Sequence, residues 1–437
     1  MRPQKKFNIR NFKPKKTVAD APKSHHVKKS KDIPLHRGFE LELKVESLSN
    51  HGDGVARIDV PAQDVTDWVI FIPFTIPGEV IRARITSNKK NCSLAELIQV
   101  TEPSPHRVTP ECQLFQACGG CQYQHIDYPE QLRWKTQQVA ELLQRLAGIE
   151  SSDLSVNPVI ASPKKYFYRS KLTPHFRKPY NGKISSIGFV SKQGSKEYLD
   201  VDHCPIALEE INRALPELRK KTHQRAKQYK KDTTLLLRAS EDKVETNPES
   251  IISEHVGDLK FNFLASDFFQ NNPSILPEFT RYAAQQATKK ASTYLIDAYC
   301  GSGLFALTLA SHFKQVAGVE VSETSVTWAR KNAELNNIEN VNFTAASAEA
   351  IFEEIDFPPE DTTILIDPPR AGCSQEFLDQ LFQFSPTSCI YISCEPATQM
   401  RDLQKFKQAG YNVKDIQPFD LFPQTRHLEC IITLDKR

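Results

Sequence analysis

Long apolar runs are absent from this 437-residue sequence. No uncharged apolar stretch reaches the ~18 residues that a membrane-spanning helix needs. The lysine-rich N-terminus is also followed by no apolar segment like that of a signal peptide. The lack of these segments argues against a membrane protein and against a secreted protein. We expect a cytoplasmic protein that does not bind membranes and acts as a monomer, with two or three domains.

Acidic residues are almost absent from the first 31 positions, where Asp20 stands against eleven Lys or Arg residues. This segment carries a net charge of +10, whereas the whole chain is +3, so the remaining residues carry −7. With few apolar residues and no periodicity, residues 1–35 are expected to form a disordered basic tail. The charge favours sequence-independent attraction to phosphates, and a merely solubilising extension is the alternative.

Turn residues divide the next segment, residues 36–102, into short predicted strands. Alternation of apolar and polar residues indicates a strand at 41–45, and similar patterns cover 69–73, 79–85 and 95–100. Short strands separated by turns favour a small β-barrel of the oligonucleotide-binding kind. Its basic edge suits contact with nucleic acid, and a barrel that serves only for packing is the alternative.

Helical and strand patterns are mixed in residues 103–265, which predicts a central α+β domain. Apolar residues recur at helical spacing over 129–147, so we expect a helix there whose buried stripe is ordinary core. Strand patterns cover 166–172, 186–190 and 234–238. The aromatic and basic residues of this part could clamp nucleotides, and buried aromatics beside a solvated edge explain them equally well.

Four cysteines of the central domain are spaced like the ligands of a metal site. Cys112, Cys118 and Cys121 form a Cys-x5-Cys-x2-Cys run, and Cys204 lies further along. Because thiols in a cytosolic chain normally stay reduced, this spacing points to metal binding before disulfides. Four thiolates suit either tetrahedral zinc or a [4Fe–4S] cluster, and the spacing leaves both open.

Strands and helices alternate from residue 266 to 437 in the βαβ manner, which predicts an α/β domain of Rossmann-like type. Near-continuous apolar runs at 315–320, 363–367 and 389–393 favour a parallel sheet covered on both faces. Further strand patterns lie at 293–297, 341–344 and 429–434.

Polar signals fall at the ends of these predicted strands, where open parallel sheets bind their ligands. Asp297 ends the first strand, and residues 300–303 form a glycine turn whose following helix can present backbone N–H groups. Glu320 ends the second strand, where a carboxylate can accept both hydroxyls of a ribose. The pattern predicts a nucleoside-bearing cofactor, although the turn also fits a dinucleotide fingerprint.

The next two strands end in Asp367-Pro368-Pro369-Arg370 and in Ser393-Cys394-Glu395-Pro396. The proline pair removes two backbone donors and fixes the loop beside the cofactor. Cys394 lies over the same crevice near a helix N-terminus, so we expect an exposed thiol with a tendency to form thiolate.

Five motifs follow one another in the order Phe268-Phe269-Gln270-Asn271-Asn272, the glycine turn, Asp367–Arg370, Ser393–Thr398 and His427-Leu428-Glu429. In this order they resemble the S-adenosylmethionine-dependent RNA uracil-C5 methyltransferases, in particular the iron–sulfur members with a TRAM domain that act on 23S rRNA. The resemblance covers nearly the whole chain beyond the tail. It implies a TRAM barrel and a class I methyltransferase domain, whose parallel sheet has an antiparallel last strand.

The resemblance implies methyl transfer to C5 of a specific uridine in structured RNA, with 23S rRNA favoured and the T-loop uridine of tRNA as the alternative. It makes Cys394 the nucleophile that adds to C6 and Glu429 the proton acceptor at C5. Because the base edge is inaccessible in a duplex, the uridine must be flipped out or already unpaired. The contacts to S-adenosylmethionine carried over by the match are Gln270, Tyr299, Glu320 and Asp367.

The cysteine spacing resembles that of the iron–sulfur members and favours a [4Fe–4S] cluster over zinc at the four positions Cys112, Cys118, Cys121 and Cys204. Leu304, Ser347 and Glu395 depart from the pattern of the family. Two other classes of function stay open: an RNA-binding or assembly factor without catalysis, and a nicotinamide dehydrogenase. Retention of Cys394 and Glu429 argues against the first.

Overall fold

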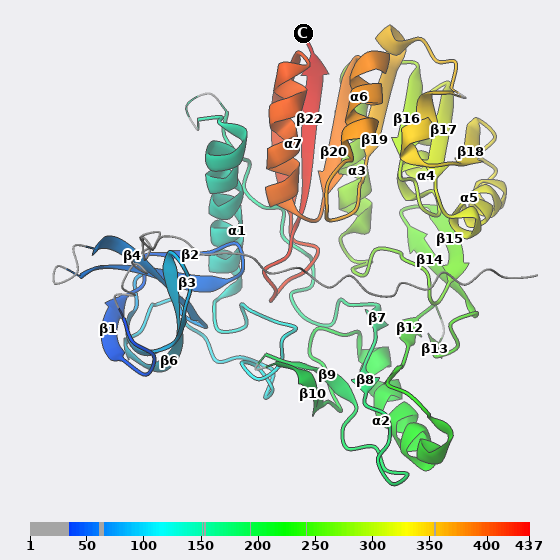
Figure 1. The fold of residues 1–437 in the computed structure, drawn as a ribbon. Helices are drawn as coiled ribbons and strands as arrows, with labels where there is room; N and C mark the ends of the chain where they lie inside the picture. The colour runs from blue at the N-terminus through cyan, green and yellow to red at the C-terminus, as the bar shows by residue number, and fades with distance from the viewer. Residues whose placement is uncertain are drawn as a thin grey trace, which may run out of the picture.

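The computed structural model describes residues 35–60, 65–150, 152, 154–192, 194–241, 243–353 and 355–437. The predicted basic tail lies outside these ranges except for its last residue, Leu35. Three parts follow one another along the chain in Figure 1: a β-rich part, a mixed central part and an α/β part that ends at the C-terminus. Among the described residues, no helix has the length and apolar character to cross a membrane.

The N-terminal part is a six-stranded sheet in the order β1-β5-β6-β4-β3-β2. Alternate residues of its strands, such as Ile70, Ile72 and Ile81, face a core of their own. The predicted strands are present, and β3 is a further strand that the sequence analysis did not predict. The bounds are β1 Glu40–Lys44, β2 Ser47–Leu48, β3 Asp53–Val60, β4 Val65–Pro73, β5 Val80–Asn88 and β6 Cys92–Glu102.

The central part begins with helix α1, Tyr128–Leu142, which a π-helical turn extends over Leu143–Ala147. The Asp127 side chain caps the helix by accepting from the Glu130 N–H. Small sheets and helix α2 follow, with strands shorter than the sequence predicts. The bounds are β7 Lys171–Leu172, β8 His175–Phe176, β9 Gly188–Ser191, β10 Gly194–Asp200, α2 Glu209–Gln224, β11 Thr233–Thr234, β12 Leu237–Ala239, β13 Val244–Glu245, β14 Ile251–Val256 and β15 Leu259–Leu264.

The C-terminal part is a seven-stranded sheet in the order β18-β17-β16-β19-β20-β22-β21. The first five strands in this order are parallel, and β22 pairs antiparallel with both β20 and β21. The predicted α/β fold with an antiparallel last strand is therefore confirmed. The bounds are α3 Leu276–Ala287, β16 Tyr294–Ala298, α4 Leu304–Leu309, β17 Gln315–Glu320, α5 Glu323–Leu335, β18 Val341–Ala345, β19 Thr362–Ile366, α6 Gln375–Phe384, β20 Ser388–Ser393, α7 Pro396–Gln408, β21 Tyr411–Phe419 and β22 Glu429–Lys436.

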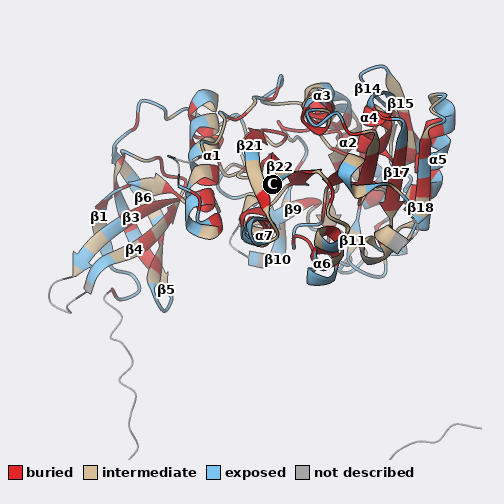
Figure 2. Cartoon of the chain, turned by 90° about the horizontal axis from the view of Figure 1, so that it is seen from above, coloured by how far each residue is buried: buried red, intermediate tan, exposed pale blue. Residues whose placement is uncertain are grey.

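Helices cover both faces of this sheet, so its central strands are buried throughout, as Figure 2 shows. Leu295, Leu365 and Ile390 point into the core on one face, and Ile296, Ile364 and Tyr391 into the core on the other. The hairpin β14–β15 also packs into the first of these cores and is held to α5 by Asn332 and Asn336. The central part and the sheet therefore share one apolar interior.

Candidate active site

The glycine turn lies at the carboxyl end of β16 and has the backbone that a close ligand contact needs. Tyr299, Gly301 and Gly303 all have positive φ, at 67°, 55° and 92°. The turn is held to the next strand because the Gly301 N–H donates to Glu320 Oε2 at 3.2 Å. The other oxygen, Oε1, accepts from the Ser322 N–H at 2.9 Å, so the Glu320 carboxylate is fixed at the end of β17.

Two further carboxyl groups stand at neighbouring strand ends. Asp297 is fully buried and accepts from the Ala306 N–H at 2.7 Å, which ties the end of β16 to helix α4. Burial raises the pKa of Asp297 well above its usual value, and the nearby charges of Asp367 and Glu320 raise it further. Burial also raises the pKa of Asp367, at the end of β19, to about 7. This edge of the sheet is thus rich in carboxyl groups that hold a proton readily.

The sheet register brings the predicted nucleophile and the predicted base together. Ser393 pairs with Cys430 in the antiparallel ladder between β20 and β22. The next residues outward, Cys394 and Glu429, are therefore neighbours at the mouth of the sheet. Cys394 is half-buried, whereas Glu429 is 4% exposed.

The expectation of a thiol poised as thiolate is wrong for the protein in this state. Cys394 lies two residues before helix α7, but burial raises the pKa of its thiol to about 12, and the charges of Glu429 and Asp367 add to the effect. Arg370 lowers the pKa of Cys394 in turn, through its charge and a hydrogen bond to the Cys394 side chain. Burial and the Asp367 charge raise the pKa of Glu429 well above its usual value.

A cavity of about 530 Å³ opens over this pair. Cys394, Glu429 and Arg370 lie on one side of it, and the central part supplies Arg169 and His175 on the other. Phe268, which is 77% exposed, also lines the cavity. A space of this size, with a thiol and a carboxyl group converging in it, can admit a nucleotide.

The four cysteines Cys112, Cys118, Cys121 and Cys204 line the same cavity. Burial raises the pKa of the Cys121 thiol to about 12 and that of Cys204 to about 11, and their neighbouring cysteines contribute. Four cysteines fit either an iron–sulfur cluster or zinc, because both bind thiolates and favour loss of the thiol protons. Within the described ranges, however, no group of three His, Cys, Asp or Glu side chains stands in an arrangement that could hold a metal ion.

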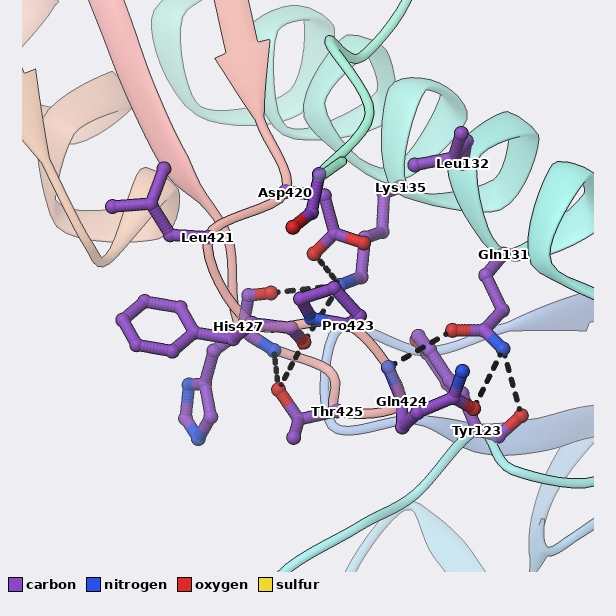
Figure 3. Close-up of polar contacts among 12 residues, drawn as sticks. Tyr123, Gln131, Leu132, Lys135, Asp420, Leu421, Pro423, Gln424, Thr425 and His427 are labelled. Atoms are coloured by element: carbon purple, nitrogen blue, oxygen red, sulfur yellow. Dashed lines mark hydrogen bonds and ion pairs between the residues drawn. The ribbon is translucent and has the colours of Figure 1, made fainter. Parts of the chain in front are cut away.

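Helix α1 holds the loop that leads to Glu429, as Figure 3 shows. Lys135 is fully buried and donates to Asp420 Oδ1 at 2.6 Å and to the His427 carbonyl at 2.8 Å. Gln131 exchanges hydrogen bonds with Gln424, through its Nε2 and its Oε1. The buried face of α1, which we predicted to be ordinary core, is thus partly a polar contact with the loop.

The cysteine run is hydrogen-bonded to the same loop. The backbone N–H groups of Gln122 and Tyr123 donate to the Gln424 carbonyl, and the Arg426 N–H donates to the Gln122 side chain. The segment around Cys121 therefore touches the loop three to five residues before Glu429. These hydrogen bonds connect two segments that line the cavity.

Three residues of the site were not singled out from the sequence. Arg370 belongs to the Asp-Pro-Pro-Arg motif, and its place beside Asp367 was a usable signal. His427 lines the cavity, and burial with nearby positive charge lowers its pKa to about 4, so its imidazole is neutral. Lys135 lies between Leu132 and Val139 on the apolar stripe, where a lysine needs a buried partner.

The sheet order and the strand-end site define a class I methyltransferase fold. Residues 220–437 match the family model described as tRNA (Uracil-5-)-methyltransferase, and residues 34–98 match the model of the TRAM domain. The chain is 39% identical to the tRNA (uracil(54)-C(5))-methyltransferase of Schizosaccharomyces pombe, over 93% of this chain and 80% of the relative. It is 33% identical to the protein of that name from Saccharomyces cerevisiae, over 94% and 76%.

A solved structure agrees with the fold. The tRNA (uracil-54, C5)-methyltransferase of Pyrococcus abyssi, in complex with S-adenosyl-L-homocysteine, superposes with a TM-score of 0.68 at 23% identity, over 90% of this chain and 100% of that one. The chain belongs to the family of RNA uracil-C5 methyltransferases. It is accordingly an S-adenosylmethionine-dependent enzyme that methylates C5 of uridine in RNA.

Proposed function

We propose that this enzyme methylates the T-loop uridine of tRNA. The support comes from two relatives with more than 30% identity, both named tRNA (uracil(54)-C(5))-methyltransferase. The expectation that favoured 23S rRNA has no such support, and its tRNA alternative is the better choice. The observation that carries the reaction itself is the placement of Cys394 beside Glu429 in one cavity.

In this proposal Cys394 loses its proton and its sulfur forms a bond to C6 of uracil. The electron pair of the C5–C6 double bond moves to C5 and O4. C5 then bonds to the methyl group of S-adenosylmethionine, whose methyl–sulfur bond breaks, and S-adenosylhomocysteine leaves. Glu429 takes the proton from C5, the C6–sulfur bond breaks, and the double bond re-forms. Arg370 favours the thiolate that the first step needs, because it is the cation that bonds to the Cys394 side chain.

Glu429 suits the role of proton acceptor because it is buried in the cavity beside Cys394. Its raised pKa makes it a stronger base than a solvated carboxylate once it is ionised. Asp367 lies close enough for its charge to raise the pKa of both catalytic groups. The proton state of the three groups is therefore shared, and loss of one proton disfavours loss of the next.

S-adenosylmethionine, when bound, supplies the methyl group as a sulfonium. We propose that Glu320 accepts the ribose hydroxyls, since its carboxylate is fixed at the strand end by two backbone N–H groups. Val321 beside it is 73% exposed and offers an apolar surface to the adenine. Gln270, Tyr299 and Asp367 complete the proposed contacts, as the sequence resemblance implies.

We propose further that the four cysteines hold a [4Fe–4S] cluster rather than zinc. Their common cavity and their donor chemistry support this, and the four thiols would have to move into a metal-binding arrangement, which the described side chains do not show. Since the run around Cys121 is bonded to the loop before Glu429, the cluster would fix one wall of the cavity. Anaerobically purified protein should absorb near 400 nm and contain iron. Stoichiometric zinc without iron in the purified protein would contradict the cluster and show a zinc site.

The function is tested with RNA that carries 5-fluorouridine. In this base, fluorine replaces the C5 hydrogen that must leave as a proton, so the thiol cannot be released. Wild-type protein should form a covalent adduct with tRNA substituted in this way, and Cys394→Ala should form none. Glu429→Gln should form an adduct even with ordinary tRNA, because the step that releases the thiol is blocked. Adduct with 23S rRNA and none with tRNA would contradict the proposed target.

A further inference from the structure

A strongly basic surface lies in the central part, outside the active-site cavity. It consists of five lysines, Lys178, Lys183, Lys227, Lys230 and Lys231, all exposed. None of the five forms an ion pair with a carboxylate in the part of the chain that the structure describes. We call these five residues the distal patch.

Two segments that are far apart in the sequence form the distal patch because β8 pairs with β11. The Asp232 carboxylate joins them by accepting from the Lys178 N–H and from Arg177. The aliphatic stem of Lys227 also lies against Gly182, where a Cβ would be 3.1 Å from the Lys227 Cγ. The patch is thus a built surface and not a chance meeting of mobile side chains.

An exposed aromatic ring stands within the distal patch. Tyr180 is 81% exposed, and the reciprocal backbone hydrogen bonds between Tyr180 and Lys183 close a tight turn. Asn181 and Gly182 in this turn have φ values of 49° and 72°, as a type I′ turn requires. The turn therefore presents Tyr180 and Lys183 rigidly to solvent. A large ring held in water beside cations is suited to stacking on a base.

The distal patch connects to the active-site cavity along β8. His175 lines the cavity and stacks on Tyr198 with ring centroids 5.6 Å apart. The guanidinium of Arg177 lies 4.9 Å from the centroid of the same ring. Lys178 follows directly. A strip of aromatic and cationic groups therefore runs from the cavity to the patch, and a nucleic acid strand that leaves the cavity meets it.

The sign of the charge argues that the distal patch is not simply solubilising. Residues 32–437 carry a net charge of −7, so five unpaired lysines gathered at one place run against the balance of the folded chain. Three of these lysines follow helix α2, which Figure 1 shows at the opposite end of the molecule from the C-terminus. We propose that the distal patch binds the phosphate backbone of the substrate RNA at a second place, remote from the methylated uridine.

This inference rests on the proposed function only in that the ligand is the substrate RNA. It requires that the patch contribute to RNA affinity and not to the chemical step. The distal patch should therefore set KM and the salt dependence of binding, and leave kcat unchanged, because its residues touch neither the uracil ring nor the methyl donor.

The experiment compares two triple variants of the full-length protein that lose the same charge. The patch variant is Lys227→Gln, Lys230→Gln and Lys231→Gln. The control variant is Lys289→Gln, Lys314→Gln and Lys436→Gln, three exposed lysines at the amino edge of the methyltransferase sheet. Binding of unlabelled tRNA is measured over a series of salt concentrations, and methyl transfer gives KM and kcat.

We expect the patch variant to bind tRNA roughly tenfold more weakly at about 0.1 M salt. Its plot of log Kd against log salt should be shallower by about 2, because up to three phosphate contacts are lost. Its kcat should stay at the wild-type value, and the control variant should match wild type throughout. Tyr180→Ala should weaken binding roughly tenfold without changing the salt slope, since stacking releases no counterions.

Equal affinities and equal salt slopes for the patch and control variants would overturn the inference. So would a fall in kcat with KM unchanged, because it would place the lysines in the chemical step. If wild-type protein methylates an RNA other than tRNA, the proposed target fails, and the same comparison with that RNA still decides the role of the patch.

Discussion

The buried ion pair between Lys135 and Asp420 makes a prediction whose magnitude follows from the structure. Both side chains are fully buried, with Nζ 2.6 Å from Oδ1. Replacing Lys135 with Met leaves the Asp420 charge without its partner inside the protein. Removal of one member of such a pair costs about 3–5 kcal/mol in the free energy of unfolding. The matched control is Arg133→Met on the same helix, whose side chain is 54% exposed, so its loss should cost about 1 kcal/mol or less.

Stability and catalysis should respond differently when the whole pair is replaced. The double variant Lys135→Met and Asp420→Leu contains no unpaired charge, so most of the lost stability should return. Activity should stay low, because the His427 carbonyl still lacks its donor, two residues before Glu429. A displacement of about 1 Å there is enough to cost up to ~100-fold in rate.

Urea unfolding measures the stability of the three variants, and kcat with tRNA measures the effect on the loop. The reasoning is refuted if Lys135→Met and Arg133→Met lose the same stability. It is also refuted if the double variant is as active as wild type, since the contact of α1 with the loop would then have no part in placing Glu429.

Three further predictions concern single groups. Arg370→Met should slow adduct formation and move its pH profile to higher pH, because the pKa of Cys394 rises when its cationic partner is lost. Stopped-flow measurements at several pH values follow the rate of adduct formation. Burial raises the pKa of Glu254 to about 7, so the folded state binds a proton that the unfolded state has already lost. Stability should therefore fall as pH rises from about 4.5 to 7. Thermal melts of Glu254→Gln should lack this loss of stability. Glu320→Ala should weaken S-adenosylhomocysteine by at least about tenfold in calorimetry, and an unchanged Kd would exclude its proposed ribose contact.

Much of the fold is visible in the sequence because buried parallel strands are nearly continuous apolar runs. The residues 362–366 and 388–393 are buried without exception, and both were predicted within one or two positions. Strand β21 was missed because Lys414 and Asp415 interrupt its pattern and Pro418 removes a donor. It lies at the sheet edge, where such residues are tolerated.

The chemistry of the site was easier to predict than its electrostatics. The motifs name Cys394 and Glu429, but only the register of β20 against β22 makes them neighbours. A helix N-terminus suggested a thiolate, and burial beside two carboxyl groups outweighs it. These terms depend on what surrounds the thiol in space, and residues distant along the chain supply them.

The contacts that position the loop before Glu429 come from still further away. Lys135 and Asp420 are 285 positions apart, and a lysine on an apolar stripe does not say which carboxylate it will meet. The distal patch likewise depends on the pairing of β8 with β11. Both are products of tertiary structure that local patterns do not contain.

Mapping the transferred methyl group shows whether Cys394 acts on the T-loop uridine of tRNA. Unmodified tRNA and 23S rRNA are incubated with the enzyme and labelled S-adenosylmethionine, digested and analysed by mass spectrometry. We expect 5-methyluridine in the T loop of tRNA, none in the rRNA, and no product with Cys394→Ala. Label in the rRNA alone, or product formed by Cys394→Ala, would contradict this expectation.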